Sequence, residues 1–120
     1  MEALKAGGVN AFRLHNSIWE EEWLKAADEV GILIVDEAAV YSDGTGYYAY
    51  NNPIFWKNYR NHIKGMIDRD LNHACLSTWS LGNGILFMGN QKYEANLPKQ
   101  LGDLGGYAKT IWNNRRGEMK

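Results

Sequence analysis

The sequence predicts an α/β fold in which three parallel strands alternate with three helices. Three short apolar runs, at 9–14, 32–35 and 75–81, are separated by segments with helical apolar spacing. The run at 32–35 is apolar on both faces, which is typical of a parallel strand that is covered on both sides. The resulting order, βαβαβα, favours a parallel sheet with right-handed crossovers.

The first strand is predicted at 9–14, between Gly7-Gly8 and the polar residues 15–17. Ser17 is expected to cap the helix that follows, and acidic residues 20–22 lie in its first turn, where the helix dipole favours negative charge. Gly31 is expected to end this helix. Its apolar residues at helical spacing are Trp19, Trp23, Ala26, Ala27 and Val30.

The second strand ends in Asp36-Glu37, and a long loop with Tyr47, Tyr48 and Tyr50 follows it. Pro53 is expected to open the second helix in its first turn. Its predicted buried stripe is Trp56, Tyr59, Ile63, Met66 and Ile67.

The third strand, 75–81, is followed by a second long loop that runs to about residue 96. The predicted last helix has an apolar stripe of Leu97, Leu101, Leu104, Ala108 and Ile111. Residues 1–112 therefore form the predicted domain, and 113–120 a tail that is expected to fray because it has no apolar pattern.

Composition excludes several classes of function. The 120 residues carry a net charge of −1, so no basic field favours nucleic acid or an anionic membrane. No apolar run approaches the roughly 20 residues of a membrane span, and the N-terminus lacks the apolar stretch of a secretory signal. The single cysteine, Cys75, excludes an internal disulfide and is expected to pack in the core. His15, His62 and His73 lack metal-ligand spacing, so no metal or cofactor is predicted.

Polar residues gather where each predicted strand ends, at 13–16, 36–37 and 80–83. In parallel α/β folds this is the end at which ligands bind. The alternative is that these residues are ordinary loop boundaries and helix caps. Because three clusters share the same register, we favour a functional site at this edge.

Two motifs carry a resemblance to a known family. Arg69-Asp70-Leu71-Asn72-His73, followed by Trp79-Ser80-Leu81-Gly82-Asn83, resembles the signature region of glycoside hydrolase family 2, which contains β-galactosidases, β-glucuronidases and β-mannosidases. Residues 9–13 and 31–37 resemble the family's second and third barrel strands. The resemblance covers about residues 1–112 and implies a partial (β/α)8 TIM barrel that comprises barrel strands two to four.

The resemblance also implies a retaining mechanism with two carboxylates. The acid/base glutamate of the family follows the asparagine that Asn83 matches, but here the next residue is Gly84. The nucleophile belongs to the seventh strand, which the chain lacks. The chain alone is therefore predicted to be an inactive fragment of a β-glycosidase, since Glu94 and Glu37, the other candidate acids, do not have the expected position.

The supporting residues of the family's site carry over one by one. By resemblance, Asn83 binds the sugar 2-hydroxyl, and Arg13 lies beneath the site and orients the nucleophile. Asp36 and Glu37 match the acidic end of the third strand. The family often has a histidine three residues after the arginine, where this chain has Asn16, while His15 lies one residue earlier. Tyr47, Tyr48 and Tyr50 are expected either to lie in the core or in a solvent-facing loop, or to stack on a sugar.

The implied partner is a carbohydrate, a β-glycoside, with no nucleic acid and no membrane. The alternative is a non-catalytic carbohydrate-binding or structural segment from a degenerate barrel. Because three strands leave an open sheet, we expect the isolated chain to be poorly stable or to self-associate through the exposed barrel edge. No localisation follows from the sequence.

Overall fold

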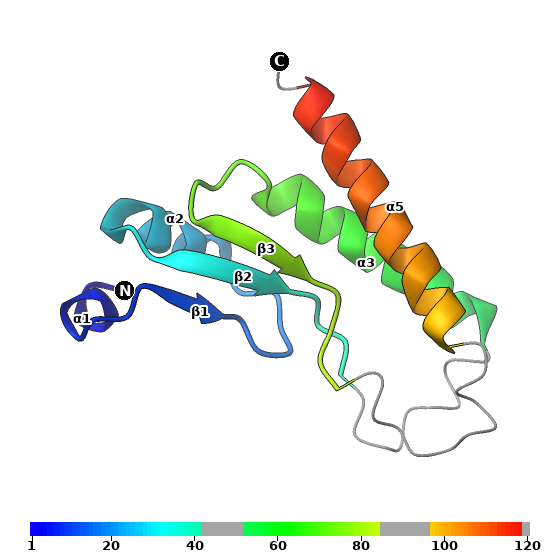
Figure 1. The fold of residues 1–120 in the computed structure, drawn as a ribbon, viewed down its shortest axis with the longest axis horizontal. Coiled ribbons are helices and arrows are strands. Elements are labelled where there is room, and N and C mark those ends of the chain that lie inside the picture. The colour runs from blue at the N-terminus through cyan, green and yellow to red at the C-terminus, as the bar shows by residue number, and fades with distance from the viewer. Residues whose placement is uncertain (42–51, 85–96, 119–120) are drawn as a thin grey trace.

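The structure is a computed structural model that describes residues 1–41, 52–84 and 97–118. Strands and helices alternate along the chain, as predicted, after one short additional helix at the N-terminus (Figure 1). The elements are α1 (Glu2–Ala6), β1 (Ala11–Arg13), α2 (Glu21–Val30), β2 (Leu33–Glu37), α3 (Pro53–Asp70), β3 (Leu76–Ser80) and α5 (Leu97–Glu118).

The three strands form one parallel sheet in the order β1-β2-β3. Arg13 pairs with Val35, and Glu37 pairs with Ser80, so the carboxyl ends of all three strands meet at one edge. A register irregularity lies between Ile34 and Val35. The predicted α/β class and parallel topology are confirmed.

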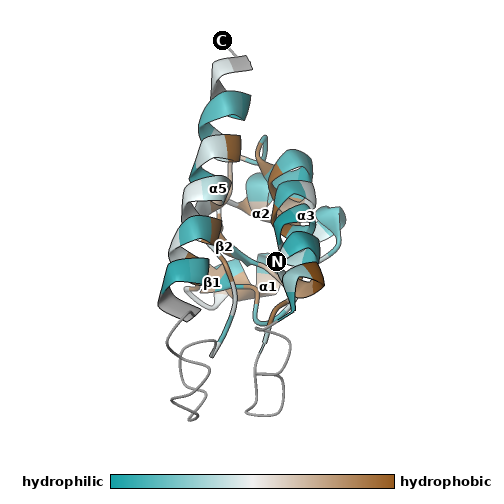
Figure 2. Ribbon diagram, turned by 90° about the vertical axis from the view of Figure 1, so that its right-hand side faces the viewer, coloured by the Kyte–Doolittle hydropathy of each residue, from teal (hydrophilic) through white to brown (hydrophobic). Residues whose placement is uncertain are grey.

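Helices cover one face of this sheet. In Figure 1, α2 and α3 lie behind the strands, and α5 crosses α3 at the far end of β3. Ile34 packs with Leu24 and Ala27 of α2 in one core. A second core joins α3 to α5. Figure 2 shows hydrophilic and hydrophobic residues alternating along α3 and α5, as in amphipathic helices.

The opposite face of the sheet has no covering helix among the described residues. Leu33 on this face is 49% exposed, and Thr78 is also exposed. Successive side chains of a strand point to opposite faces, so Leu33, Val35 and Glu37 share the open face while Ile34 and Asp36 face the helices.

The start of α2 differs from the prediction. The helix begins at Glu21, with Glu20 rather than Ser17 as its N-cap residue. As a result, Leu24 and Ala27 are buried, whereas Trp23 is 45% exposed and stacks edge-on against Trp19. The end of the helix is as predicted, because Gly31 adopts a left-handed conformation with φ 75°.

The predicted α3 is confirmed at both its start and its buried face. Pro53 occupies the first turn, and the side-chain oxygen of Asn52 accepts the Ile54 N–H at 2.9 Å. All five residues of the predicted stripe are buried.

The last helix is longer than predicted. α5 continues to Glu118, through most of the segment in which we expected a tail without regular structure. Leu104 and Ala108 are buried, and Leu101 and Ile111 pack against the same core. Among the described residues, no helix combines the length and the apolar character that crossing a membrane requires.

Candidate functional site

Glu37, the last residue of β2, connects the ends of all three strands. Its side chain is fully buried. Its Oε1 accepts the backbone N–H of Asn16 at 2.9 Å, and its Oε2 accepts the hydroxyl of Ser80 at 2.7 Å. The Oε2 atom also lies 3.3 Å from Nη1 of Arg13. One carboxylate therefore ties the segment after β1 and the end of β3 to β2.

Arg13 extends this network to Asn83. Its Nη2 donates to Oδ1 of Asn83 at 3.3 Å. The backbone N–H of Asn83 donates to the carbonyl of Val40 at 2.9 Å, and Asn83 forms a parallel bridge with Tyr41. The segments after β2 and β3 thus remain paired beyond the strands and bring Asn83 to the mouth of the sheet. We call Arg13, Asn16, Glu37, Ser80 and Asn83 the Glu37 cluster.

Asn16 has an unusual backbone conformation. Its φ is 57°, in the left-handed region that asparagine tolerates better than most residues. This turn points its N–H at Glu37. Its side-chain Oδ1 is buried and has no hydrogen-bond partner among the described residues. A buried polar atom without a partner is uncommon in folded proteins.

His15 lies beside this cluster in sequence but is exposed. Its carbonyl accepts the hydroxyl of Ser17 at 3.3 Å. Among the described residues, its imidazole makes no hydrogen bond to the Glu37 cluster. The structure therefore brings Arg13, Asn16, Glu37 and Asn83 together and leaves His15 at the surface.

Asp36 has the opposite orientation to Glu37. It is fully buried on the helix-covered face of β2, where its neighbour is the buried Asp70 at the end of α3. Burial and, second, the adjacent Asp70 carboxyl raise the pKa of Asp36 to about 8. As a carboxylate, Asp36 has no hydrogen-bond partner for either oxygen within the described part of the chain, but a protonated Asp36 can donate to Asp70. The sequence placed Asp36 with Glu37 at the mouth, whereas the structure places it beneath the sheet.

Arg69 holds the other member of this buried carboxyl pair. Its Nε and Nη2 both donate to the carboxylate of Asp70, and Nη2 also donates to the carbonyl of Trp19 at 2.7 Å. A fork of this kind fixes both partners. The Arg69-Asp70 dipeptide of the motif therefore joins α3 to the entrance of α2.

Two side chains of α3 position the segments that carry the site. The hydroxyl of Tyr59 donates to the carbonyl of Leu81, and Nε2 of His62 accepts the N–H of Ala39 at 2.8 Å. Burial lowers the pKa of His62, which favours the neutral ring that this acceptor role requires. From the sequence, Tyr59 was expected in the core and no role was predicted for His62. Residues three apart lie on the same helix face, and this spacing was the one feature of the sequence that could have linked His62 to Tyr59.

The family model of the glycosyl hydrolases family 2 TIM barrel domain matches residues 1–104. The chain belongs to glycoside hydrolase family 2. The α/β barrel architecture of that domain agrees with the three parallel strands and helices described above.

The relatives of this family 2 chain include β-galactosidases and a putative β-glucuronidase. A β-galactosidase from Vibrio cholerae is 34% identical over 85 residues, which are 69% of this chain and 8% of that protein. A putative β-glucuronidase from Formosa agariphila is 34% identical over 88 residues, 73% of this chain and 10% of the relative. The family 2 chain thus spans about a tenth of the length of these relatives.

Solved structures show the same arrangement. β-Glucuronidase from Bifidobacterium dentium, complexed with coumarin-3-O-glucuronide, matches with a TM-score of 0.77 and 26% identity over 92% of this chain and 17% of that one. β-Glucuronidase from Ruminococcus gnavus, in complex with a C6-substituted uronic isofagomine, matches with a TM-score of 0.75 and 29% identity, over 92% of this chain and 18% of that one.

Gly84 directly follows Asn83 in this family 2 chain and has a φ of 65°. Glycine adopts this left-handed conformation readily, whereas other residues do so at a cost of about 1–2 kcal/mol. The backbone at this position is therefore shaped for glycine. The other residues considered for catalysis or stacking, Glu94, Tyr47, Tyr48 and Tyr50, lie outside the described residues.

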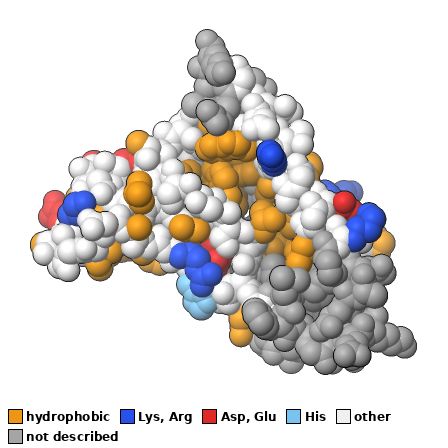
Figure 3. Space-filling model, viewed as in Figure 1, with side chains coloured by type: hydrophobic (Ala, Val, Ile, Leu, Met, Phe, Trp, Pro, Cys, Tyr) orange, Lys and Arg blue, Asp and Glu red, His pale blue; other side chains and the backbone are white. Residues whose placement is uncertain are grey.

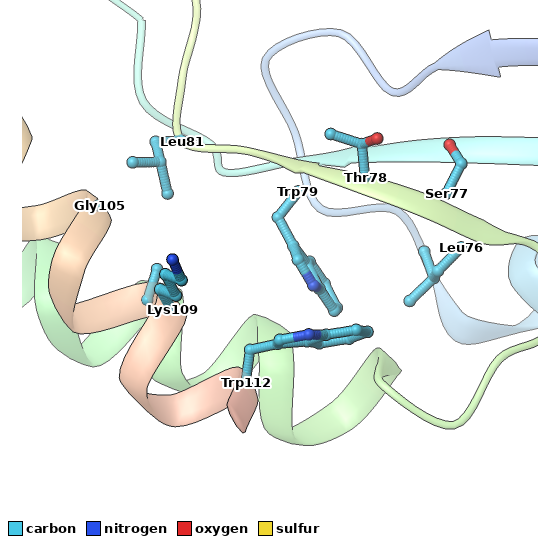
Figure 4. Close-up of a pocket in the computed structure, with 9 residues that line it drawn as sticks. Leu76, Ser77, Thr78, Trp79, Leu81, Gly105, Lys109 and Trp112 are labelled. Atoms are coloured by element: carbon cyan, nitrogen blue, oxygen red, sulfur yellow. The ribbon is translucent and has the colours of Figure 1, made fainter. Parts of the chain in front are cut away.

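An open pocket of about 380 Å³ lies between β3 and α5, away from the Glu37 cluster. Figure 3 shows apolar side chains gathered in a hollow between the sheet and α5. In Figure 4, Trp79 of β3 and Trp112 of α5 point toward each other, and their ring centres lie 5.7 Å apart. Among the described strands, β3 is paired only with β2. In this family 2 chain the pocket therefore marks an open side of the barrel.

Proposed function

We propose that the chain forms the part of a retaining β-glycosidase active-site wall that barrel strands two to four supply. The observation that carries this proposal is the Glu37 cluster. A buried carboxylate holds Arg13 directly and, through Arg13, orients Asn83 at the carboxyl ends of parallel strands. Ligands of parallel barrels bind at this end.

In this proposal Asn83 and Asn16 bind the sugar. The amide of Asn83 donates to the 2-hydroxyl, because its Oδ1 is already occupied by Arg13 and its NH₂ group remains to donate. The side chain of Asn16, whose backbone N–H is held by Glu37, binds a second hydroxyl. Arg13 presents positive charge beneath the site, where it would orient a carboxylate nucleophile. His15 lies at the surface beside the site, and Asp36 has a supporting role on the helix-covered face of the sheet.

Gly84 makes the chain inactive in hydrolysis. A retaining glycosidase needs a general acid for the leaving oxygen and a nucleophile about 5–5.5 Å from it. Glycine has no group that transfers a proton. Position 84 therefore supplies no general acid, although the residues proposed to bind and orient the substrate are retained.

A second candidate function is carbohydrate binding without hydrolysis. The left-handed backbone at Gly84 favours it, because a glutamate would adopt this conformation only at a cost of about 1–2 kcal/mol. The same Asn83 and Asn16 amides would then bind a sugar that is not cleaved. A purely structural segment would need neither amide.

A chimera tests the proposal. Residues 9–84 replace the matching segment of the Vibrio cholerae β-galactosidase, and the chimera is compared with its Gly84→Glu variant on aryl and alkyl β-galactosides. General acid catalysis contributes about 10²–10⁴ in rate, so the glutamate should restore turnover by about that factor. The gain should be larger for alkyl leaving groups, because they depend more on protonation.

The matched control is Gly84→Gln, which has the same size and backbone demands but transfers no proton. Equal activity of the Gln and Glu variants would contradict the assignment of this position to the acid. An additional Asn83→Ala change tests both candidate functions against a purely structural segment, since the binding of a galactoside inhibitor should weaken in every version that binds sugar through Asn83.

A further inference from the structure

A second polar cluster lies at the opposite end of the sheet from the Glu37 cluster. It combines Asp28 of α2 with His73 and Cys75, which lie in the turn between α3 and β3. One potential ligand atom from each of the three residues lies within 4.8 Å of the other two. His73 is 10% exposed at its side chain, Asp28 is 27% exposed, and Cys75 is buried.

The contacts already fix the three side chains. Nδ1 of His73 lies 2.6 Å from Oδ2 of Asp28, and Oδ1 of Asp28 accepts the backbone N–H of Cys75 at 2.7 Å. The other ring nitrogen, Nε2, lies 3.3 Å from Oε1 of Glu21. Side chains of α2 and of the turn before β3 therefore meet at His73.

We propose that Nδ1 of His73, a carboxylate oxygen of Asp28 and Sγ of Cys75 form a binding site for Zn²⁺. Thiolate and imidazole ligands favour zinc over magnesium or calcium, and three protein ligands leave a fourth position for water. Glu21 completes the arrangement, since a metal-bound histidine usually donates its other N–H to a carboxylate. Each ligand required for such a site is present.

The distances need only small changes. Ligand atoms around tetrahedral zinc lie roughly 3.3–3.8 Å apart, given bonds of about 2.0–2.3 Å. The His73–Asp28 contact would open from 2.6 Å to this separation, by about 0.7–1.2 Å, and the cysteine sulfur would approach from within the 4.8 Å limit.

The charge of the surrounding side chains suits a cation, because the carboxylates of Asp28 and Glu21 both face His73. When Zn²⁺ binds, the Cys75 thiol releases its proton to solvent, and Nδ1 of His73 gives up the proton that it shares with Asp28, either to solvent or to Nε2 by tautomerisation, so that the sulfur–zinc and nitrogen–zinc bonds can form.

The sequence could not indicate this site because its ligands come from distant segments. Asp28 and His73 are 45 residues apart, and Asp28 and Cys75 are 47 apart. Zinc would tie α2 to the turn that begins β3. Its expected effect is therefore on the stability of the chain and not on chemistry at the Glu37 cluster.

Titration of the 120-residue chain with Co²⁺, followed by competition with Zn²⁺, tests the proposal. Because Cys75 is the only cysteine, a thiolate-to-cobalt charge-transfer band can arise from no other residue. We expect this band at one metal per chain, together with the intense visible bands of tetrahedral cobalt, and their loss when Zn²⁺ is added. Zn²⁺ should also raise the thermal midpoint.

The isosteric variant Cys75→Ser should lose the charge-transfer band, and Asp28→Asn and His73→Gln should weaken cobalt binding at least tenfold. Glu22→Gln, an exposed neighbour on α2, is the matched control and should bind normally. Far-UV circular dichroism checks that each variant retains its helices. Absence of the band in the wild-type chain, or a band that His73→Gln leaves unchanged in a folded variant, would overturn the proposal.

Discussion

Asp36 and Glu37 are adjacent residues of the same type in opposite environments. Glu37 faces the open side of the sheet and is compensated by Arg13, Ser80 and the N–H of Asn16. Asp36 faces the helices, where the buried carboxyl of Asp70 adds to the effect of burial and raises its pKa. Because side chains alternate along a strand, the two acidic residues differ: Glu37 is a carboxylate with hydrogen-bond partners at the strand ends, whereas Asp36 is a buried carboxyl that keeps its proton.

The raised pKa of Asp36 predicts a specific dependence of stability on pH. In the unfolded chain the carboxyl loses its proton near its ordinary value of 3.8, whereas in the fold it keeps the proton to about pH 8. Between these values the folded state binds more protons, so the free energy of unfolding contributed by Asp36 falls as pH rises. Below about pH 4 both states are protonated, and the contribution is fully present.

Urea unfolding of the wild type and of Asp36→Asn between pH 4 and 8 measures this contribution. The wild-type advantage over the variant should shrink by more than about 1.4 kcal/mol, the equivalent of a tenfold change in proton affinity. His62 is common to both proteins and cancels in the difference. Asp68→Asn is the control, because Arg115 and Lys64 lower the pKa of Asp68 and its effect falls below this window. A constant difference between wild type and Asp36→Asn would refute the assignment.

At this scale the sequence predicted which residues gather but not which way they face. The strand-end rule brought Arg13, Glu37 and Asn83 together correctly. Strand alternation implies that Asp36 and Glu37 face opposite sides, but which side the helices cover is a tertiary feature that the strand-end rule does not contain. Nor could it indicate His62 or the Asp28–His73 pair, whose partners are 23 and 45 residues away.

At the scale of elements, α3 supports both the core and the site. Its buried stripe packs against α5, while Tyr59 and His62 hold the segments after β3 and β2. Gly65 lies inside this helix, and a Cβ added there would meet nothing within 4 Å. Glycine inside a helix costs backbone entropy without any local need for its freedom.

Two glycine substitutions should therefore have opposite effects on stability. Gly65→Ala should stabilise the chain by about 0.5–1 kcal/mol. Gly31→Ala should destabilise it by about 1–2 kcal/mol, because φ is 75° and a Cβ there meets only Lys5 Nζ, at 4.0 Å, so the cost is conformational and not steric. Chemical denaturation monitored by circular dichroism measures both. Effects of the same sign would contradict these local conformations.

Some helix boundaries could be predicted from the sequence and others could not. The C-terminal end of α2 and the start of α3 follow from Gly31 and Pro53, which act through their own backbone geometry. The predicted start of α2 was wrong. Ser17 is a suitable cap residue, but the segment 17–20 stays outside the helix, and the carbonyl of Trp19 accepts a hydrogen bond from Arg69. The extension of α5 to Glu118 had no apolar pattern to reveal it.

At the scale of the whole molecule, the chain is a thin two-layer slab. Its extents are 47 × 36 × 18 Å, and its Cα radius of gyration is 15.8 Å. A compact domain of this length would have a radius of about 13.6 Å. Three strands and the helices on one face leave apolar surface that further barrel strands would cover, including Leu33 and the pocket beside β3.

This open face predicts that the chain associates with itself at micromolar concentration, because unpaired strand edges and apolar patches favour contact between copies. Leu33→Lys places a charge on the open face and should shift sedimentation-velocity profiles toward the monomer. Ile54→Lys is the matched control, since Ile54 is a comparably exposed aliphatic residue, 65% exposed, on α3 and away from the sheet. A wild-type chain that sediments as a monomer and melts cooperatively would contradict the prediction. Equal dissociation by both variants would place the contact elsewhere than on the sheet.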